Sequence, residues 1–212
     1  DGKKNHVING ITDWVYEEEF AFVRAFEWNS TGDYLAFLRF DETEVPTFSM
    51  DMVGKDLYPD QQVFKYPKAG EKNADVTLHM YTLSSKNTKK ISLGDYEYIP
   101  RIKWSNDADI LVATTLNRHQ NNLKLHKVDA LKSSATLLLN ETDKAYIDIT
   151  DNLTFLADNS FIWTSEKDGY NHIYHYNFSG KLINQITKGN WEVTKYYGFN
   201  ENKKTIYYQS VE

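Results

Sequence analysis

The sequence contains no cysteine, and this absence excludes two kinds of site at once. Neither a disulfide nor a thiolate metal site can form in these 212 residues. Proline and glycine are also few, at 4 and 10 residues, which excludes collagen-like and low-complexity chains. No run of 18 apolar residues occurs, so no segment is long enough to span a membrane as a helix. The net charge of −6 comes without a basic stripe, and we therefore expect no nucleic-acid partner.

Two motifs of catalytic chains are missing as well. A Gly-x-Ser-x-Gly nucleophile elbow needs two glycines four residues apart, and a Gly-x-Gly dinucleotide fingerprint needs two glycines two apart. Neither spacing occurs. His172 and His175 are three residues apart, but on a strand such positions face opposite sides, and a tetrahedral site needs more ligands. We expect no catalytic residue, no metal and no cofactor in this chain.

Aromatic side chains are plentiful, with 15 Tyr, 11 Phe and 5 Trp. Such side chains fit the pleated surface of a sheet. Apolar or alternating runs predict strands at residues 34–40, 76–83, 173–178 and 206–211. Between them lie turn clusters rich in Gly, Asn, Asp and Ser, for example at residues 29–33 and 166–169. Many short strands with closely spaced turns predict an all-β chain.

A weak repeat runs along the chain. Each unit opens with an aromatic anchor, at residues 26–28, 102–104, 153–155 and 197–199, and the steps between the anchors' last residues are 76, 51 and 44. Propeller blades of four strands typically repeat every 40 to 50 residues. The long first step contains an insertion at about residues 41–75. The repeat predicts a partial β-propeller of about four blades, each a four-stranded antiparallel sheet, and because so few blades do not obviously close a ring we expect a fragment.

The strongest local feature is the run DWVYEEEF at residues 13–20. One interpretation is a solvated acidic turn, since three adjacent carboxylates repel one another. The other is a pair of carboxylates poised for a cation. Neighbours on a strand point apart, whereas neighbours on one helical turn or bulge can converge on one ligand. The flanking apolar residues Trp14, Val15, Tyr16, Phe20 and Phe22 would hold such a pair rigid and lower the local dielectric constant.

The run at residues 13–20 overlaps a longer segment that resembles a known family. Residues 9–19 (NGITDWVYEEE) are very similar to the glutamate motif of the dipeptidyl peptidase IV family. Further landmarks follow in the family's order: residues 41–46 (DETEVP), 66–70 (YPKAG), 168–173 (DGYNHI) and 186–193 (ITKGNWEV). The resemblance spans nearly the whole chain and is weakest at about residues 117–150.

The resemblance implies an eight-bladed parent propeller that sits over an α/β-hydrolase domain. Residues 1–212 would be a fragment of that N-terminal propeller, without the hydrolase domain and its Ser, Asp and His. The family releases Xaa-Pro or Xaa-Ala dipeptides from free amino termini, so the full-length parent would be a serine-type dipeptidyl peptidase and the fragment alone would be inactive. The family's substrate-site arginine would precede this chain.

Carried over residue by residue, Glu18 and Glu19 would bind the substrate ammonium, Glu17 would support them, and Phe155 would be an aromatic near a substrate pocket. A free α-amine has a pKa near 8 and is largely charged at neutral pH. Two carboxylates accept its N–H groups through charge-assisted bonds. Two extended residues span roughly 7 Å, so a clamp about that far from a serine counts off one dipeptide.

The resemblance also implies partners and a location. These are peptide substrates with a free amino terminus, the protein's own hydrolase domain, and a second copy in a homodimer, reached by an arm at residues 47–73. The prolines and charges in and beside this segment are compatible with an exposed loop. Export is expected from the resemblance. The absence of cysteine favours a bacterial periplasm or cell surface, because animal members of the family use disulfides in this domain. Two alternatives stay open: a propeller that only binds proteins, and a related tripeptidyl peptidase.

Overall fold

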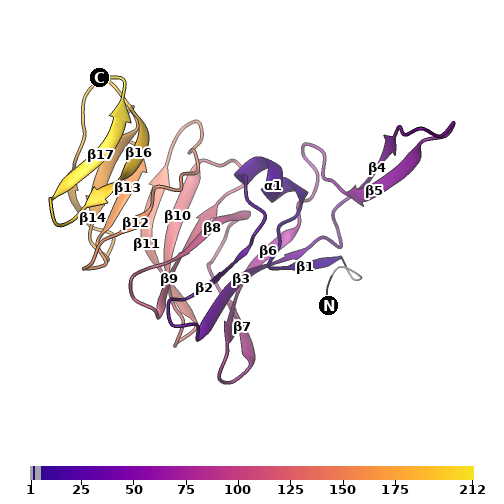
Figure 1. Ribbon diagram of the computed structural model, residues 1–212, viewed down its shortest axis with the longest axis horizontal. Helices are drawn as coiled ribbons and strands as arrows, with labels where there is room; N and C mark the ends of the chain where they lie inside the picture. Colours follow the sequence, from indigo (N-terminus) through magenta and orange to yellow (C-terminus); the bar gives the residue numbers. More distant parts are fainter. Residues whose placement is uncertain (1, 3–5) are drawn as a thin grey trace. The chain divides into compact units, whose positions relative to one another are not determined.

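The computed structural model describes residue 2 and residues 6–212, and strands dominate this part of the chain (Figure 1). One helix, α1 (Trp14–Phe20), lies there among strands β1 (Val7–Asn9), β2 (Phe26–Trp28), β3 (Tyr34–Asp41), β4 (Thr47–Met52), β5 (Asp60–Lys65), β6 (Asp75–Thr82), β7 (Asn87–Ile91), β8 (Tyr98–Trp104), β9 (Ile110–Leu116), β10 (Asn122–Asp129), β11 (Ser134–Thr142), β12 (Thr154–Phe155), β13 (Phe161–Ser165), β14 (His172–Tyr176), β15 (Leu182–Gln185), β16 (Val193–Asn200) and β17 (Thr205–Ser210). The predicted all-β class is confirmed. None of the helical residues described forms a segment long and apolar enough to cross a membrane.

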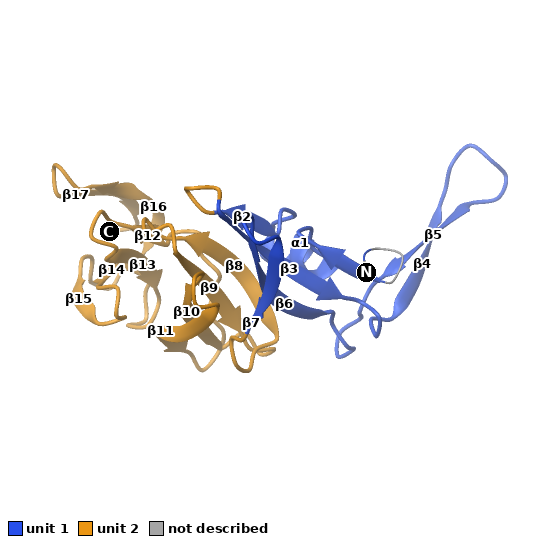
Figure 2. Cartoon of the chain, turned by 90° about the horizontal axis from the view of Figure 1, so that it is seen from below, with its two compact units in different colours: residues 1–28, 33–91 blue, residues 29–32, 92–212 orange. Residues whose placement is uncertain are grey.

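The chain divides into two compact units (Figure 2). Unit 1 comprises residues 1–28 and 33–91, and unit 2 comprises residues 29–32 and 92–212. The main sheet of unit 1 has the order β1-β3-β6-β7, and β2 also pairs with β3. Alternate residues of its two long strands are buried: Val76, Leu78 and Met80 on β6, as its period-2 pattern predicts, and Ala36, Leu38 and Phe40 on β3, which was predicted as a strand from its apolar run.

The insertion in unit 1 forms a two-stranded hairpin, β4–β5, with Thr47 opposite Lys65 and Met52 opposite Asp60. The sequence predicts an exposed loop here, and the segment is exposed, but it is paired rather than irregular. The rings of Phe48 and Phe64 meet across the strands at 6.0 Å, and such cross-strand pairs stabilise a hairpin.

Unit 2 contains two four-stranded meanders, β8 to β11 and β12 to β15, followed by the pair β16–β17. Every residue of β9 and of β13 is buried, so these strands are covered on both faces. The four predicted anchors fall on β2, β8, β12 and β16. The first three open the meanders β2-β3-β6-β7, β8 to β11 and β12 to β15, and β16 opens the pair β16–β17. The predicted partial propeller is confirmed, and its fourth sheet is the two-stranded pair β16–β17.

The turns that follow these first strands are hydrogen-bonded in series within unit 2. The Asn29 amide donates to the carbonyl of Ala108 at 3.0 Å, which explains why residues 29–32 belong to unit 2. In the same way Asn106 donates its amide to the carbonyl of Leu156 at 2.7 Å. The next turn continues the series, since the amide of Ala157 donates to the Glu201 carboxylate at 3.0 and 3.1 Å.

Candidate functional site

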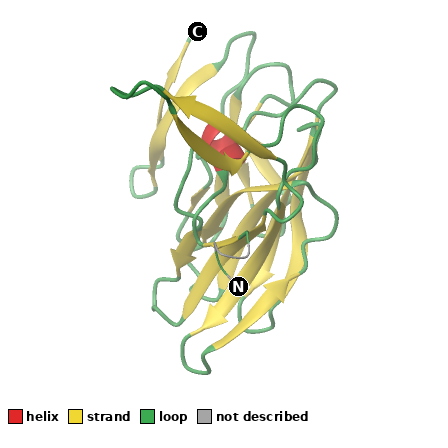
Figure 3. Ribbon diagram, turned by 90° about the vertical axis from the view of Figure 1, so that its right-hand side faces the viewer, coloured by secondary structure: helices red, strands yellow, loops and turns green. Residues whose placement is uncertain are grey.

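The helix α1 lies in an excursion from the edge of the main sheet of unit 1, and Figure 3 shows it in red. Strands β1 and β2 run one after the other along the same edge of β3. Between them, two residues oppose Leu38: Gly10 donates its N–H to the Leu38 carbonyl, and Leu38 donates its own to the carbonyl of Ala25, both at 2.9 Å. Two residues opposite one is the arrangement of a β-bulge. Here residues 11–24 are inserted between the two bulge residues.

A short neck fixes this excursion to the sheet. Ile11 and Arg24 form an isolated antiparallel bridge. Thr12 donates its backbone N–H to the Val23 carbonyl at 3.0 Å and its hydroxyl to the Phe22 carbonyl at 2.9 Å. The helix is therefore held at both of its ends by backbone bonds rather than carried on an open loop.

The sequence of the helix sets its limits and its buried face. Asp13 is the N-cap, and its carboxylate accepts the N–H of Tyr16 at 3.0 Å. The helix ends at Ala21, which adopts the left-handed conformation with φ 55°. Tyr16 and Phe20, one turn apart, are both buried, and the Tyr16 ring packs edge-on against Phe40 of β3 at 4.8 Å. The aromatic residues of the motif thus attach the helix to the sheet.

The three glutamates lie on the other side of the helix and are exposed. Successive residues of a helix are about 100° apart, so Glu18 points away from the buried Tyr16 and Phe20 while Glu17 and Glu19 flank it. Neighbouring carboxylates need a helical turn or bulge to converge, as expected from the sequence, and a helical turn is present. The expected low dielectric constant around the acids is not found, because Tyr16 and Phe20 turn toward the sheet and the three glutamates are exposed.

The cap residue Asp13 was not singled out from the sequence, although it is the buried carboxylate of the motif. Burial raises the pKa of Asp13 to about 6, against the opposing hydrogen bond from the backbone of Tyr16. A carboxyl group with a higher pKa in the folded state binds more protons there than in the unfolded chain. Its contribution to stability is therefore complete below about pH 4 and is lost as the pH rises through about 6.

We expect Asp13→Asn to keep the cap, since the amide oxygen still accepts the Tyr16 N–H, and to remove the ionisation. The variant should equal the wild type near pH 4 and exceed its free energy of unfolding by about 1–3 kcal/mol at pH 7. Urea unfolding at several pH values measures this. Asp13→Ala, which also loses the acceptor, should be about 1 kcal/mol less stable than Asp13→Asn. An unchanged pH slope in Asp13→Asn would show that this carboxyl is not the group that titrates.

The other predicted site residue, Phe155, lies on β12 in unit 2 and is half-buried. Its ring is 6.3 Å from that of Phe161 and 5.9 Å from that of Phe178. These contacts account for its position within the sheet, and its role beside a substrate stays a prediction.

His172 and His175 lie on β14, where each contacts a different protein partner. The Gly189 carbonyl can only accept, so Nε2–H of His172 donates to it at 3.1 Å, and Nδ1 lies 3.0 Å from the Thr187 hydroxyl, which also accepts the N–H of Ile173 at 2.9 Å. Nε2 of His175 is 2.8 Å from the Ser160 hydroxyl. Nowhere in residues 6–212 do three or more His, Asp or Glu side chains gather in a way that would hold a metal ion.

Unit 2 also contains a cavity of about 440 Å³ that the sequence did not predict. It is formed by the crossover at residues 141–150 and the β13–β14 hairpin, with Glu141, Trp163 and Lys167 in its wall. The Trp163 indole donates to the Glu141 carboxylate at 3.1 Å, and burial raises the pKa of that carboxyl. Burial also lowers the pKa of Lys167, whose ammonium is 3.8 Å from the ring centre of Tyr174. The family resemblance is weakest at this crossover, which is why no signal indicated the cavity.

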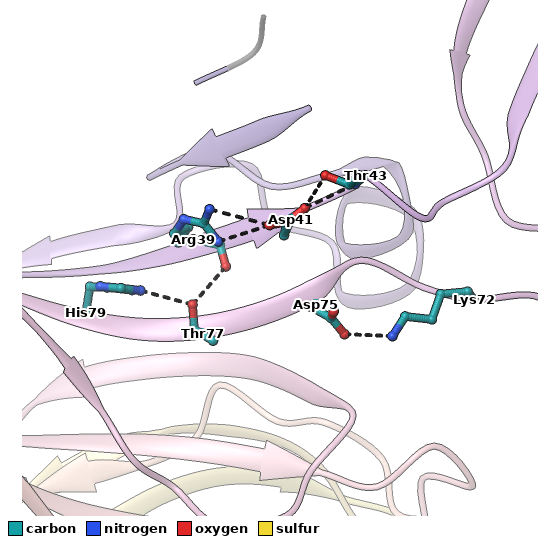
Figure 4. A network of polar contacts seen from close by, with 7 residues as sticks. All are labelled: Arg39, Asp41, Thr43, Lys72, Asp75, Thr77 and His79. Atoms are coloured by element: carbon teal, nitrogen blue, oxygen red, sulfur yellow. Dashed lines mark hydrogen bonds and ion pairs between the residues drawn. The ribbon is translucent and has the colours of Figure 1, made fainter. Parts of the chain in front are cut away.

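A polar network lies at the root of the β4–β5 hairpin in unit 1 (Figure 4). Asp41 accepts from the backbone N–H of Thr43 at 3.2 Å and from its hydroxyl at 2.6 Å, and these bonds lower the pKa of the Asp41 carboxyl. Arg39 contacts the same carboxylate at 3.4 Å. On the neighbouring strand, the Thr77 hydroxyl is 3.0 Å from Nε2 of His79. The DETEVP landmark at residues 41–46 therefore forms a capped turn that leads into the hairpin.

Comparison with known proteins gives a consistent result. A family model described as "Dipeptidyl peptidase IV (DPP IV) N-terminal region" matches residues 1–212. The chain is 30% identical to a probable dipeptidyl peptidase 4 of Aspergillus flavus, over 97% of this chain and 29% of the relative. It is 33% identical to dipeptidyl aminopeptidase B of Saccharomyces cerevisiae, over 88% of this chain and 25% of the relative. The chain thus spans less than a third of the length of these relatives.

Two solved structures have a similar fold. The crystal structure of Porphyromonas gingivalis dipeptidyl peptidase 4 is similar with a TM-score of 0.92 and 45% identity, over 98% of this chain and 30% of that one. A putative dipeptidyl aminopeptidase IV from Bacteroides ovatus is similar with a TM-score of 0.82 and 26% identity, over 100% of this chain and 33% of that one.

Proposed function

Because the chain belongs to the dipeptidyl peptidase IV family as part of its N-terminal region, we propose that it is the substrate-recognition part of a serine exopeptidase. The full-length protein would release Xaa-Pro or Xaa-Ala dipeptides from free amino termini. Its Ser, Asp and His would belong to an α/β-hydrolase domain outside these 212 residues, so this chain alone would not cleave a peptide.

The observation that carries the proposal is the helix α1. Glu18 and Glu19 are adjacent on its exposed side, and the helix is fixed by its cap, its neck and its buried rings. An ammonium group has three N–H donors and no acceptor, and two neighbouring carboxylates satisfy it through charge-assisted bonds. Glu17, on the far flank from Glu19, would support the pair through the local negative potential.

Because such a site binds the amino-terminal charge, it would select the length of the released peptide rather than its sequence. The ammonium is fixed at one end, and about 7 Å of extended chain reaches from it to the second peptide bond. A serine placed at that distance would cut after the second residue. Pro or Ala at this second residue would be selected elsewhere in the full-length protein, and Phe155 is the residue of this chain that we propose to contribute.

The test uses the full-length protein with Ala-Pro and Gly-Pro reporter substrates, each with a free and with an acetylated amino terminus. We expect acetylation to lower kcat/KM by about 100-fold or more, because the carboxylates then face a group without charge. A tripeptide reporter should be cleaved poorly. Preferential release of tripeptides would favour the tripeptidyl alternative, and no peptide release at all would leave a propeller that only binds proteins.

Two further proposals concern the full-length protein. The hairpin β4–β5 exposes Val53, Leu57 and Tyr58 near its tip by 80–90%, which suits an arm that contacts a second copy in a homodimer. Sedimentation of the full-length protein tests this, and a monomer at micromolar concentration would refute it. Export to a periplasm or cell surface is tested by fractionation of the source cells.

A further inference from the structure

The root of the β4–β5 hairpin is a fixed structure within unit 1. The Tyr66 backbone N–H donates to the Pro46 carbonyl at 2.9 Å, and the Lys65 ammonium donates to the Val45 carbonyl at 2.8 Å. Above these bonds three rings form a cluster. The Tyr66 ring lies 5.4 Å from Phe48 and 5.9 Å from Phe64.

This cluster continues onto the helix of the glutamates. The Trp14 ring, on the first residue of α1, is 4.2 Å from the Tyr66 ring, a closer approach than any within the hairpin cluster. Tyr66 is separated from Trp14 by more than fifty residues of sequence, so the contact joins two parts of unit 1 that the chain does not join locally.

The position of Trp14 on the helix relates this contact to the glutamates. Residues four apart lie on the same side of a helix, one turn above the other, so Trp14 and Glu18 share a side. Tyr16 and Phe20 hold the opposite side against β3. The helix is therefore held between rings of its own sheet and a ring of the hairpin root, and the second contact lies one turn below a proposed ligand of the substrate ammonium.

We propose that Trp14 and Tyr66 are positioning residues, through which the hairpin root sets the orientation of Glu18 and Glu19 toward the substrate amino terminus. The inference rests on the proposed function. It extends the recognition site from the helix to the root of the hairpin, so that a partner bound to the hairpin would also act on substrate affinity. Loss of either ring would remove the contact that steadies the Glu18 side of the helix, while the cap, the neck and the buried Tyr16 and Phe20 would still attach the helix to the sheet.

The experiment measures kcat and KM of the full-length protein on an Ala-Pro reporter. Trp14→Ala and Tyr66→Ala are each expected to raise KM by about 10-fold with kcat within about 2-fold, because binding of the amine is weakened but the reacting groups are untouched. The double variant should be no worse than either single variant, since both remove one contact. Tyr66→Phe, which keeps the ring, should restore the wild-type KM.

A second Trp–Tyr pair supplies the control. The rings of Trp191 and Tyr208 stack at 6.3 Å in unit 2, whereas the helix α1 belongs to unit 1. Tyr208→Ala should leave KM unchanged. An equal change of KM in Tyr208→Ala and Tyr66→Ala would overturn the inference, since it would report general destabilisation.

Two further outcomes separate this inference from the proposed function. If Glu18→Ala and Glu19→Ala impair activity but Trp14→Ala and Tyr66→Ala do not, the positioning role is wrong and the clamp stands. If the glutamate variants leave the kinetics unchanged, the proposed clamp is wrong and the positioning role falls with it. Should Tyr66→Ala fail to fold, Tyr66→Leu keeps apolar bulk without the ring, and a wild-type KM in that variant would overturn the inference.

Discussion

In the full-length protein, Glu18→Ala and Glu19→Ala are each expected to lower kcat/KM for Ala-Pro and Gly-Pro reporters by about 100-fold or more, which is about 2.7 kcal/mol. The loss has a simple cause. The substrate ammonium keeps its charge but loses one of two carboxylates that accept its N–H groups. Glu18→Gln and Glu19→Gln keep the size of the side chain and one acceptor oxygen. The loss of kcat/KM in these variants therefore measures the part of the effect that depends on charge.

Glu17 provides the matched control, because it lies in the same run and is exposed in the same way. We expect Glu17→Ala to lower kcat/KM by less than about 10-fold, as a supporting charge rather than a ligand. Circular dichroism should confirm that each variant is folded. Equal and small effects at all three positions would return the run to a solvated acidic turn and leave the propeller assignment standing.

Gly180→Ala is expected to cause a large loss of stability. Gly180 has a φ of +81°, which L side chains rarely adopt, and an added Cβ would lie 2.8 Å from the carbonyl carbon of Leu138 and closer still to its oxygen. Leu138 lies at a bulge of β11, between Leu137 and Leu139, which pair with His126 and Leu125 of β10 and so limit its displacement. We expect the free energy of unfolding to fall by about 3 kcal/mol or more.

Gly94→Ala separates the clash from the backbone strain. Gly94 has a φ of +76°, almost the same as that of Gly180, but an added Cβ there meets nothing within 4 Å. Its replacement should cost about 1–2 kcal/mol, from strain alone. Urea unfolding of both variants gives the difference. Equal losses would mean that Leu138 moves aside at little cost.

The sequence predicted the sheets better than it predicted the site. The apolar run at residues 34–40, the alternation at residues 76–83 and the spacing of the aromatic anchors are local patterns that the fold keeps. The cap at Asp13 has a local signal too, an aspartate before a helical run, but three consecutive glutamates drew attention to charge instead. The contact of Trp14 with Tyr66 has no local signal, because the hairpin that separates them in sequence must fold back before the two rings can meet.

The cavity beside Glu141 and Lys167 was missed for a related reason. Its wall is built from a crossover and a hairpin turn, where residue type is weakly constrained by secondary structure. The hairpin β4–β5 was predicted as a loop because of its prolines and charges, and its pairing depends on two rings, Phe48 and Phe64, within the insertion at residues 47–73 rather than on an apolar face.

Because of the bulge at Leu38, residues 11–24 could be replaced by another segment without a change in the pairing of the sheet. Strand β1 stops and β2 resumes at one position of β3, so the pairing register on either side does not depend on what lies between Gly10 and Ala25. A segment of another length or composition could occupy this place while the sheet kept every other pair. If the proposed ammonium site is correct, variation in substrate choice would therefore accumulate in residues 11–24, while selection on folding would act mainly on the sheet that carries them.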